Sequence, residues 1–172
     1  MDKPLIDARE IDGEAVRGSV RTWLRLLATT NLIERELAAR LRARFNVSLA
    51  RFDYMAQLDR AGGSGLTMGA LGARLMVTGG NITGLTDRLQ NEGLVRRMAD
   101  SADRRVQRVA LTPNGKRLFR HMATEHADWV RELFDGLNED QRQSLSDLTG
   151  ALRQSVMRRD DITLTYLPGD KQ

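Results

Sequence analysis

The sequence contains no cysteine, which excludes both disulfide bonds and a thiol-based redox switch. It has no apolar run that approaches ~18 residues, so we expect no membrane span. Residues 1–7 are charged and short of apolar side chains, unlike a secretory signal peptide. These absences predict a cytoplasmic protein.

The residue sets of common enzyme sites are missing as well. His121 and His126 fall on different faces of a predicted helix, and no cysteine or paired carboxylate completes a metal site. The glycines of residues 79–84 match those of a P-loop, but Leu85 stands where that loop needs lysine. There is no Gly-x-Ser-x-Gly elbow. We therefore predict neither an enzyme nor a bound cofactor or metal.

What the chain does contain is a pair of short helices within residues 67–91. Thr67 is a favourable N-cap, and the residues that follow have the spacing of one buried face: Met68, Leu71 and Leu75. Thr78 caps a second helix, which ends near Gly93 and has an inner stripe of three residues: Ile82, Leu85 and Leu89. Two helices with so short a connection predict a helix-turn-helix.

The other face of the second helix carries small or hydrogen-bonding residues: Gly80, Asn81, Thr83, Gly84, Thr86, Asp87 and Arg88. Small side chains let a helix enter a major groove, and Asn, Thr and Arg supply groups that bond to base edges and phosphates. The alternative is a solvated surface helix, whose glycines each cost roughly 1 kcal/mol relative to alanine.

A β-hairpin with Arg104 and Arg105 at its tip is predicted next, because residues 94–98 and 104–111 are rich in Val and Leu and flank a turn-forming cluster. Residues 94–120 hold eight cations against two anions, a net of +6, whereas the whole chain carries +4. The positive charge is therefore local. It fits a nucleic-acid footprint, although a charged run is also typical of a solvated face.

Amphipathic helices flank this module. Residues 16–45 form one long predicted helix, and Thr112-Pro113 and Asn138 open two more. Their apolar surface exceeds what one side of a module can cover, so we expect a twofold homodimer, with a monomer as the alternative. The fold class is mainly α with a small β-hairpin. The expected division is an arm and dimerisation helix (1–47), a winged module (48–112), dimerisation helices (113–157) and a flexible tail (158–172).

This order of elements resembles the MarR family of bacterial winged helix-turn-helix regulators over roughly residues 16–156. The most specific part is an Asp-x-Arg wing tip, Asp103 and Arg105, followed by Leu-Thr-x-x-Gly at residues 111–115. The resemblance implies that Arg105 enters the minor groove of double-stranded DNA and that Asp103 orients it. The complete expected DNA-binding set is Thr78, Gly80, Asn81, Thr83, Gly84, Thr86, Asp87, Arg88, Asp103, Arg104 and Arg105.

The same resemblance implies a ligand-responsive regulator, with repression as the expected mode. By analogy with the family, Trp23, Tyr54 and Met76 face an effector cleft, although ordinary core packing is the alternative. Residues 51–58 and 75–81 resemble a subgroup whose effectors include hydroxycinnamic compounds and their CoA thioesters, so an aromatic acid or aromatic acyl-CoA is the expected ligand. The alternative function is a helical protein-protein interaction module that uses the apolar face of residues 118–134 and does not bind DNA.

Overall fold

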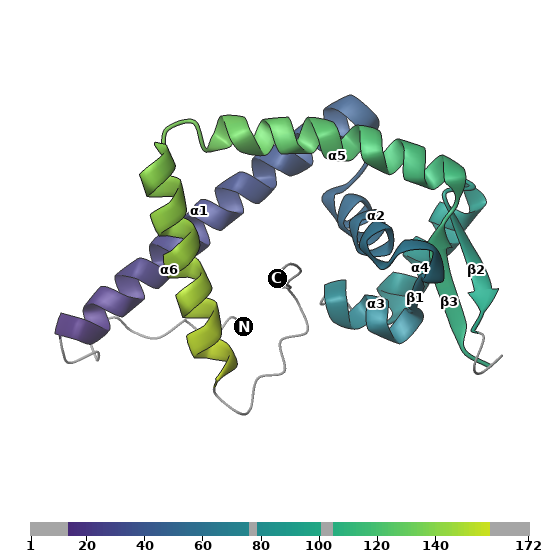
Figure 1. Cartoon of the computed structure of the whole chain (residues 1–172), viewed down its shortest axis with the longest axis horizontal. Coiled ribbons are helices and arrows are strands. Elements are labelled where there is room, and N and C mark those ends of the chain that lie inside the picture. Colours follow the sequence, from purple (N-terminus) through teal and green to yellow (C-terminus); the bar gives the residue numbers. More distant parts are fainter. Residues whose placement is uncertain (1–13, 76–78, 101–104, 159–172) are drawn as a thin grey trace, which may run out of the picture.

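The computed structural model describes residues 14–75, 79–100 and 105–158, with the side chains of all but 14–16 and 79–81. Within these ranges the helices are α1 (Glu14–Phe45), α2 (Leu49–Ala61), α3 (Met68–Leu75), α4 (Gly79–Asn91), α5 (Pro113–Leu133) and α6 (Glu139–Met157), with a 3-10 turn, η1, at Gly62–Ser64. The strands are β1 (Leu66–Thr67), β2 (Val95–Ala99) and β3 (Gln107–Leu111). The small sheet and the helices α2 to α4 lie at one end, while α6 and the N-terminal half of α1 lie at the other (Figure 1).

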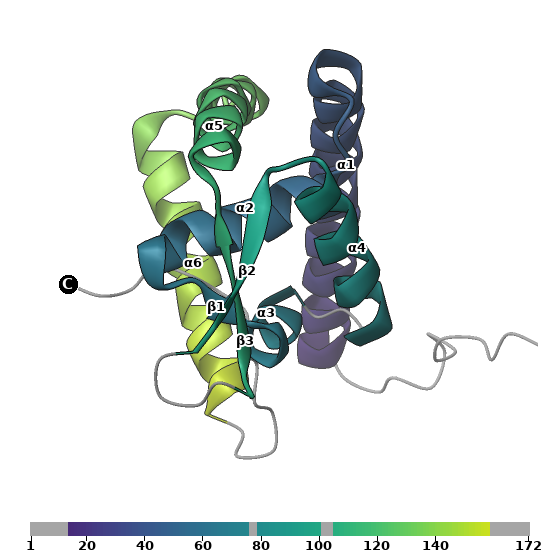
Figure 2. The ribbon, with the colours of Figure 1, turned by 90° about the vertical axis from the view of Figure 1, so that its right-hand side faces the viewer.

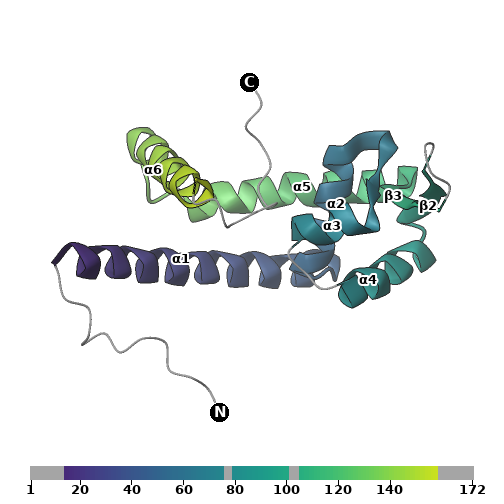
Figure 3. The same cartoon turned by 90° about the horizontal axis from the view of Figure 1, so that it is seen from below.

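Helix α1 packs against α2 and α5 through its C-terminal part. Leu37 and Leu41 are buried there, and Arg40 pairs with Glu132 of α5 at 2.5 Å. α1 and α5 run alongside each other in the view from below (Figure 3). The N-terminal half of α1 extends past this contact and leaves large apolar side chains exposed, Trp23 and Leu24 among them.

Capping hydrogen bonds mark the starts of three helices and confirm the two that the sequence predicted at Thr112 and Asn138. The Ser48 hydroxyl accepts a bond from the Arg51 amide at 3.3 Å, and the Thr112 hydroxyl accepts one from Gly115 at 3.0 Å. Asn138 and Gln141 exchange two bonds of 2.9 Å in a capping box. These local bonds satisfy amides that the first helical turn leaves without backbone partners.

The sheet has three antiparallel strands in the order β1-β3-β2, one more strand than the sequence predicted (Figure 2). The hairpin pairs Val95 with Leu111 and Ala99 with Gln107, so the register of the wing is continuous. The short β1 adds Leu66 opposite Val109. Gly65 permits this close pairing, because it has a φ of +63° and a Cβ there would lie 2.3 Å from the Val109 carbonyl oxygen.

The hydrophobic core lies beneath the helix pair and the sheet. Its fully buried side chains come from six elements: Leu41, Tyr54, Met55, Leu58, Leu71, Ile82, Leu89, Val109 and Met122. Helix α6, in contrast, has no buried residue. The winged module and the C-terminal part of α1 therefore share one core, to which α6 does not contribute.

Candidate nucleic-acid interface

Helices α3 and α4 form the predicted helix pair. Thr67 caps α3 by accepting a hydrogen bond from the Ala70 amide at 3.1 Å. At the other end, α4 terminates where the Leu94 amide bonds to the Leu89 carbonyl at 2.9 Å and Gly93 adopts a φ of +69°. The predicted cap Thr78 lies outside the described residues.

The inner face of α4 consists of Ile82, Leu89 and Thr86, all buried. The prediction that Thr86 faces outward with the DNA-reading residues was wrong. Thr86 follows Ile82 by four residues and precedes Leu89 by three, which places it on the same helical stripe. Its hydroxyl bonds to the Ile82 carbonyl at 2.8 Å and lies 2.5 Å from the Tyr54 hydroxyl.

The outer face of α4 presents Thr83, Asp87 and Arg88 as exposed side chains, with the partly exposed Gly84 between them. Gly80 and Asn81 belong to the first turn of the helix, and the Asn81 side chain lies outside the described part. No large apolar side chain of the described residues 82–91 is exposed on this helix. The face is therefore narrow and polar, as a groove-reading helix requires.

Asp87 also joins α4 to the hairpin. Arg97 of β2 donates to the Asp87 carboxylate at 2.5 Å and to the Gln90 side-chain oxygen at 2.8 Å. This pairing neutralises a carboxylate that would otherwise repel phosphates, and it fixes the helix against β2. The sequence reading missed Arg97, because its partner lies ten residues earlier on a different element.

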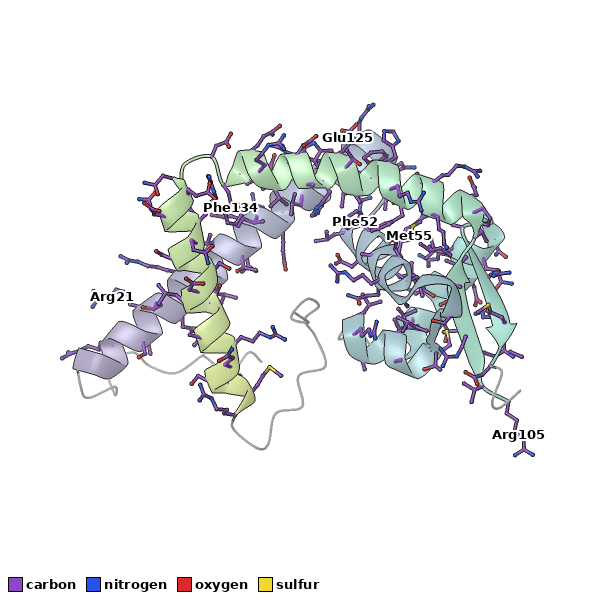
Figure 4. The ribbon with its side chains drawn as sticks, viewed as in Figure 1. Arg21, Phe52, Met55, Arg105, Glu125 and Phe134 are labelled. Carbon is purple, nitrogen blue, oxygen red and sulfur yellow. The ribbon has the colours of Figure 1, made fainter. Side chains whose placement is uncertain are left out.

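The hairpin ends in an exposed arginine. Arg105 follows the loop before β3 and points away from the body of the protein (Figure 4). Its neighbours Asp103 and Arg104 lie outside the described residues, so the orienting role of Asp103 stays a prediction. Arg108, by contrast, pairs with Asp100 and donates to the Gly65 carbonyl at 3.1 Å, which assigns this cation to the internal structure of the sheet.

Trp23 and Tyr54, two of the residues expected to face an effector, do not share one site. Trp23 is exposed on α1, whereas Tyr54 is fully buried in the core, and Met76 lies outside the described residues. The structure instead contains a pocket of about 550 Å³ between α1, α2, the end of α3 and α4, and neither Trp23 nor Tyr54 lines it. Its walls include Gly84, Leu85 and Arg88 of the recognition helix.

The two histidines have separate surroundings. His121 meets the edge of the Phe45 ring, and His126 stacks on Phe52 with ring centroids 4.5 Å apart. Among the described residues there is no cluster of three or more His, Asp or Glu side chains placed to hold a metal ion. In the same ranges, none of the helices combines the length and the apolar character needed to cross a bilayer.

A helix pair followed by an antiparallel hairpin, with a polar second helix and an arginine beyond the strands, defines a winged helix-turn-helix. A family model described as MarR family matches residues 45–106. A MarR family transcriptional regulator from Silicibacter pomeroyi, known from its crystal structure, is 30% identical in sequence to this chain. The two structures match with a TM-score of 0.69 over 86% of this chain and 99% of the other. The chain belongs to the MarR family and is a transcriptional regulator of that type, not an enzyme.

Two further relatives complete the comparison. Sco3205 from Streptomyces coelicolor, a MarR family regulator crystallised in complex with DNA, is 23% identical, with a TM-score of 0.72 over 97% of this chain and 99% of its own. YsmB from Bacillus subtilis, an uncharacterised HTH-type transcriptional regulator, is 33% identical over 76 residues. That match covers 44% of this chain and spans 52% of the length of YsmB.

Proposed function

We propose that the protein binds a pseudo-palindromic operator in double-stranded DNA as a homodimer and represses transcription until a small-molecule effector releases it. The observation that carries this proposal is the pairing of Arg97 with Asp87 at 2.5 Å. It links the recognition helix to the hairpin, so that exposed Thr83, Arg88 and Arg105 belong to one unit. The recognition helix and the hairpin can therefore contact the same stretch of duplex DNA.

Each part has a distinct task on DNA. Helix α4 fits the major groove, where Thr83 and Arg88 meet base edges or phosphates. Arg105 enters the adjacent minor groove, where the negative potential attracts a guanidinium group. The fold shared with DNA-bound Sco3205 supports this docking.

Exposed apolar surface supports the homodimer. Leu24 and Leu32 of α1 and Leu148 and Leu152 of α6 are all large, apolar and between 48% and 70% exposed. A mostly apolar groove of about 450 Å³ lies between α1 and α6, and a second copy of the chain fills it in our proposal. Such an assembly places two recognition helices about 10 base pairs apart, which is why the operator is expected to be a pseudo-palindrome.

This arrangement also assigns a role to each part of the chain. Residues 1–47 and 113–157 form the dimerisation lobe, and residues 48–112 form the DNA-binding module. The dimer exists with its two DNA-binding modules either at the spacing that fits the operator or at another spacing. An effector that binds the second state more tightly lowers operator affinity, and the difference between its affinities for the two states sets how much. An aromatic acid or its CoA thioester remains the effector class suggested by the family resemblance.

The alternative of a protein-binding module without DNA affinity has less support. It relied on the apolar face of residues 118–134, but Phe119 and Met122 of that face are buried in the core of the chain. Leu118 and Trp129 pack against the same core. Little of that face is left for another protein.

Retention of genomic fragments tests the proposal. The purified protein is incubated with sheared DNA of its source organism, and the retained fragments are sequenced. We expect enrichment of a pseudo-palindrome with half-sites about 10 base pairs apart. Retention without any shared sequence, or no retention at low salt, would contradict operator binding.

A further inference from the structure

The pocket beside the recognition helix has an apolar floor and charged walls. Leu49, Leu75 and Leu85 supply the apolar surface, while Glu34 and Asp53 contribute carboxylates and Arg51 and Arg88 contribute guanidinium groups. A volume of about 550 Å³ lies within the range of small-molecule sites. A ligand of this pocket therefore has to match an apolar surface and charges of both signs.

The carboxylates of the pocket are compensated only in part, through the charge of Arg60. Asp53 and Glu34 make no hydrogen bond or ion pair with another residue in the described ranges. Burial raises the pKa of Asp53 above its ordinary value, and the charge of Glu34 raises it further, while Arg60 acts in the opposite direction. A cation placed between the two carboxylates offsets the cost of burying the Asp53 charge and the repulsion between Asp53 and Glu34.

The guanidinium side has an unfilled donor. Arg51 pairs with Glu92, but its Nε atom is buried and has no hydrogen-bond partner in the described part of the chain. A buried donor without a partner is unfavourable. Arg88, on the facing helix, likewise has no ion-pair partner among the described residues. Because the Arg51 Nε atom is closed to solvent, the guanidinium group that a ligand carboxylate can reach is that of the exposed Arg88.

We propose that this pocket binds a zwitterionic molecule with an apolar body, of the α-amino acid type, whose ammonium group meets Glu34 and Asp53 and whose carboxylate meets Arg88. The inference rests on the proposed function of a ligand-responsive regulator, and it replaces the effector class that the family resemblance suggests. An aromatic acid without an amine pairs with Arg88 but leaves Glu34 and Asp53 without an ion pair. An aromatic acyl-CoA adds phosphates that the two carboxylates repel.

The pocket shares a residue with the expected DNA-binding face. Arg88 lines the pocket and is exposed on the outer face of α4, and the partly exposed Gly84 lines it as well. A carboxylate that binds Arg88 removes this cation from its DNA contact, so ligand and operator compete for one guanidinium group. This competition gives the ligand the differential affinity that release requires.

Three compounds that share a phenyl group test the contributions of the ligand's ammonium and carboxylate groups separately. Phenylalanine carries both groups, hydrocinnamate lacks the amine, and phenethylamine lacks the carboxylate. In calorimetric titrations without DNA we expect phenylalanine to bind at least about tenfold more tightly than either single-charge compound. Equal binding of hydrocinnamate and phenylalanine, or no heat from any of them at millimolar concentration, would overturn the zwitterion proposal.

Two variants locate the preference in the pocket. Asp53→Asn is expected to bring the affinity for phenylalanine down to that for hydrocinnamate, since the ammonium group loses its charged partner. Asp59→Asn, on the same helix but outside the pocket wall, serves as the matched control and keeps the preference. If Asp53→Asn does not fold, the exposed Glu34→Gln gives the same test. Unchanged preference in the folded variant would contradict the assignment.

A third variant tests the shared arginine. Arg88→Gln is expected to weaken binding of both phenylalanine and DNA while leaving phenethylamine binding unchanged. Loss of DNA binding alone would remove Arg88 from the ligand site. If the protein binds its operator but shows no preference for phenylalanine, only this inference is contradicted. If it prefers phenylalanine but retains no DNA, only the proposed operator binding is contradicted.

Discussion

The hydroxyl groups of Tyr54 and Thr86 lie 2.5 Å apart in the core, joining α2 to the inner face of the recognition helix. Thr86 has one hydroxyl proton, and its 2.8 Å bond to the Ile82 carbonyl uses it, so Tyr54 is the donor of the pair. Burial raises the pKa of Tyr54, which keeps the phenol protonated and able to donate. The bond ties the DNA-reading helix to the helix that lines the pocket.

Removing the hydroxyl group of either residue is expected to lower the free energy of unfolding, but by different amounts in the two variants. Thr86→Val leaves the Tyr54 hydroxyl buried without an acceptor and should lower the free energy of unfolding by about 1–3 kcal/mol. Tyr54→Phe leaves Thr86 bonded to Ile82 and should cost about 1 kcal/mol. Urea unfolding at one fixed protein concentration measures both values. A stable Thr86→Val protein with altered base preference would instead return Thr86 to the DNA-binding set.

The burial of Thr86 shows where sequence reasoning about the site failed. The 3.6-residue period located the helices, and the capping residues located their starts, because both signals are local. Thr86 was placed by its polarity, although its spacing from Ile82 and Leu89 puts it on the buried stripe. The buried hydroxyl bonds to the Ile82 carbonyl within its own helix and to Tyr54 of α2, and the second contact spans 32 residues of sequence.

The third strand and the pocket were missed for related reasons. β1 has two residues, too few for an alternating pattern, and it exists because Gly65 permits close approach to Val109. The charged wall of the pocket draws on residues of three helices, from Glu34 to Arg88. No local period relates these positions, so only the fold brings them together.

Arg105 is expected to add affinity that does not depend on sequence. Arg105→Ala should weaken binding to all operator variants and reduce the slope of log affinity against log salt by about 1. Gel-shift titrations at several salt concentrations measure both quantities. Arg21→Ala is the matched control, since that arginine lies at the opposite end of the molecule from the wing (Figure 4). Equal losses in the two variants would point to general charge and not to the wing.

Thr83 is expected to contribute to base preference. It is exposed on the outer face of α4, one turn away from Asp87 and close to the start of the helix. Thr83→Ala should change the preferred base pairs at one position in each half-site, which a randomised-site selection detects. Thr124→Ala, an exposed threonine of α5, should leave the selected sequence unchanged. An unaltered preference in Thr83→Ala would exclude direct readout by this residue.

Leu148 tests the dimer. Its side chain is 70% exposed in the single chain, so Leu148→Glu should leave the protomer folded while placing a charge in the proposed apolar interface. Sedimentation should show a monomer and gel shifts a loss of operator affinity. Gln154→Glu adds the same charge to the same exposed helix as a control. A wild-type protein that is monomeric at micromolar concentration would refute the architecture.

His126 makes the stability of the α2–α5 contact depend on pH. Burial against Phe52 lowers the pKa of His126 below its ordinary value of 6.5. The unfolded chain therefore takes up the proton at a higher pH than the folded one, so the free energy of unfolding falls as the pH drops through about 6.5 toward the lowered pKa. Urea unfolding across this range should show the fall in the wild type and a smaller one in His126→Gln. His121→Gln removes the exposed histidine of the same helix, outside the α2 contact, and serves as the control variant.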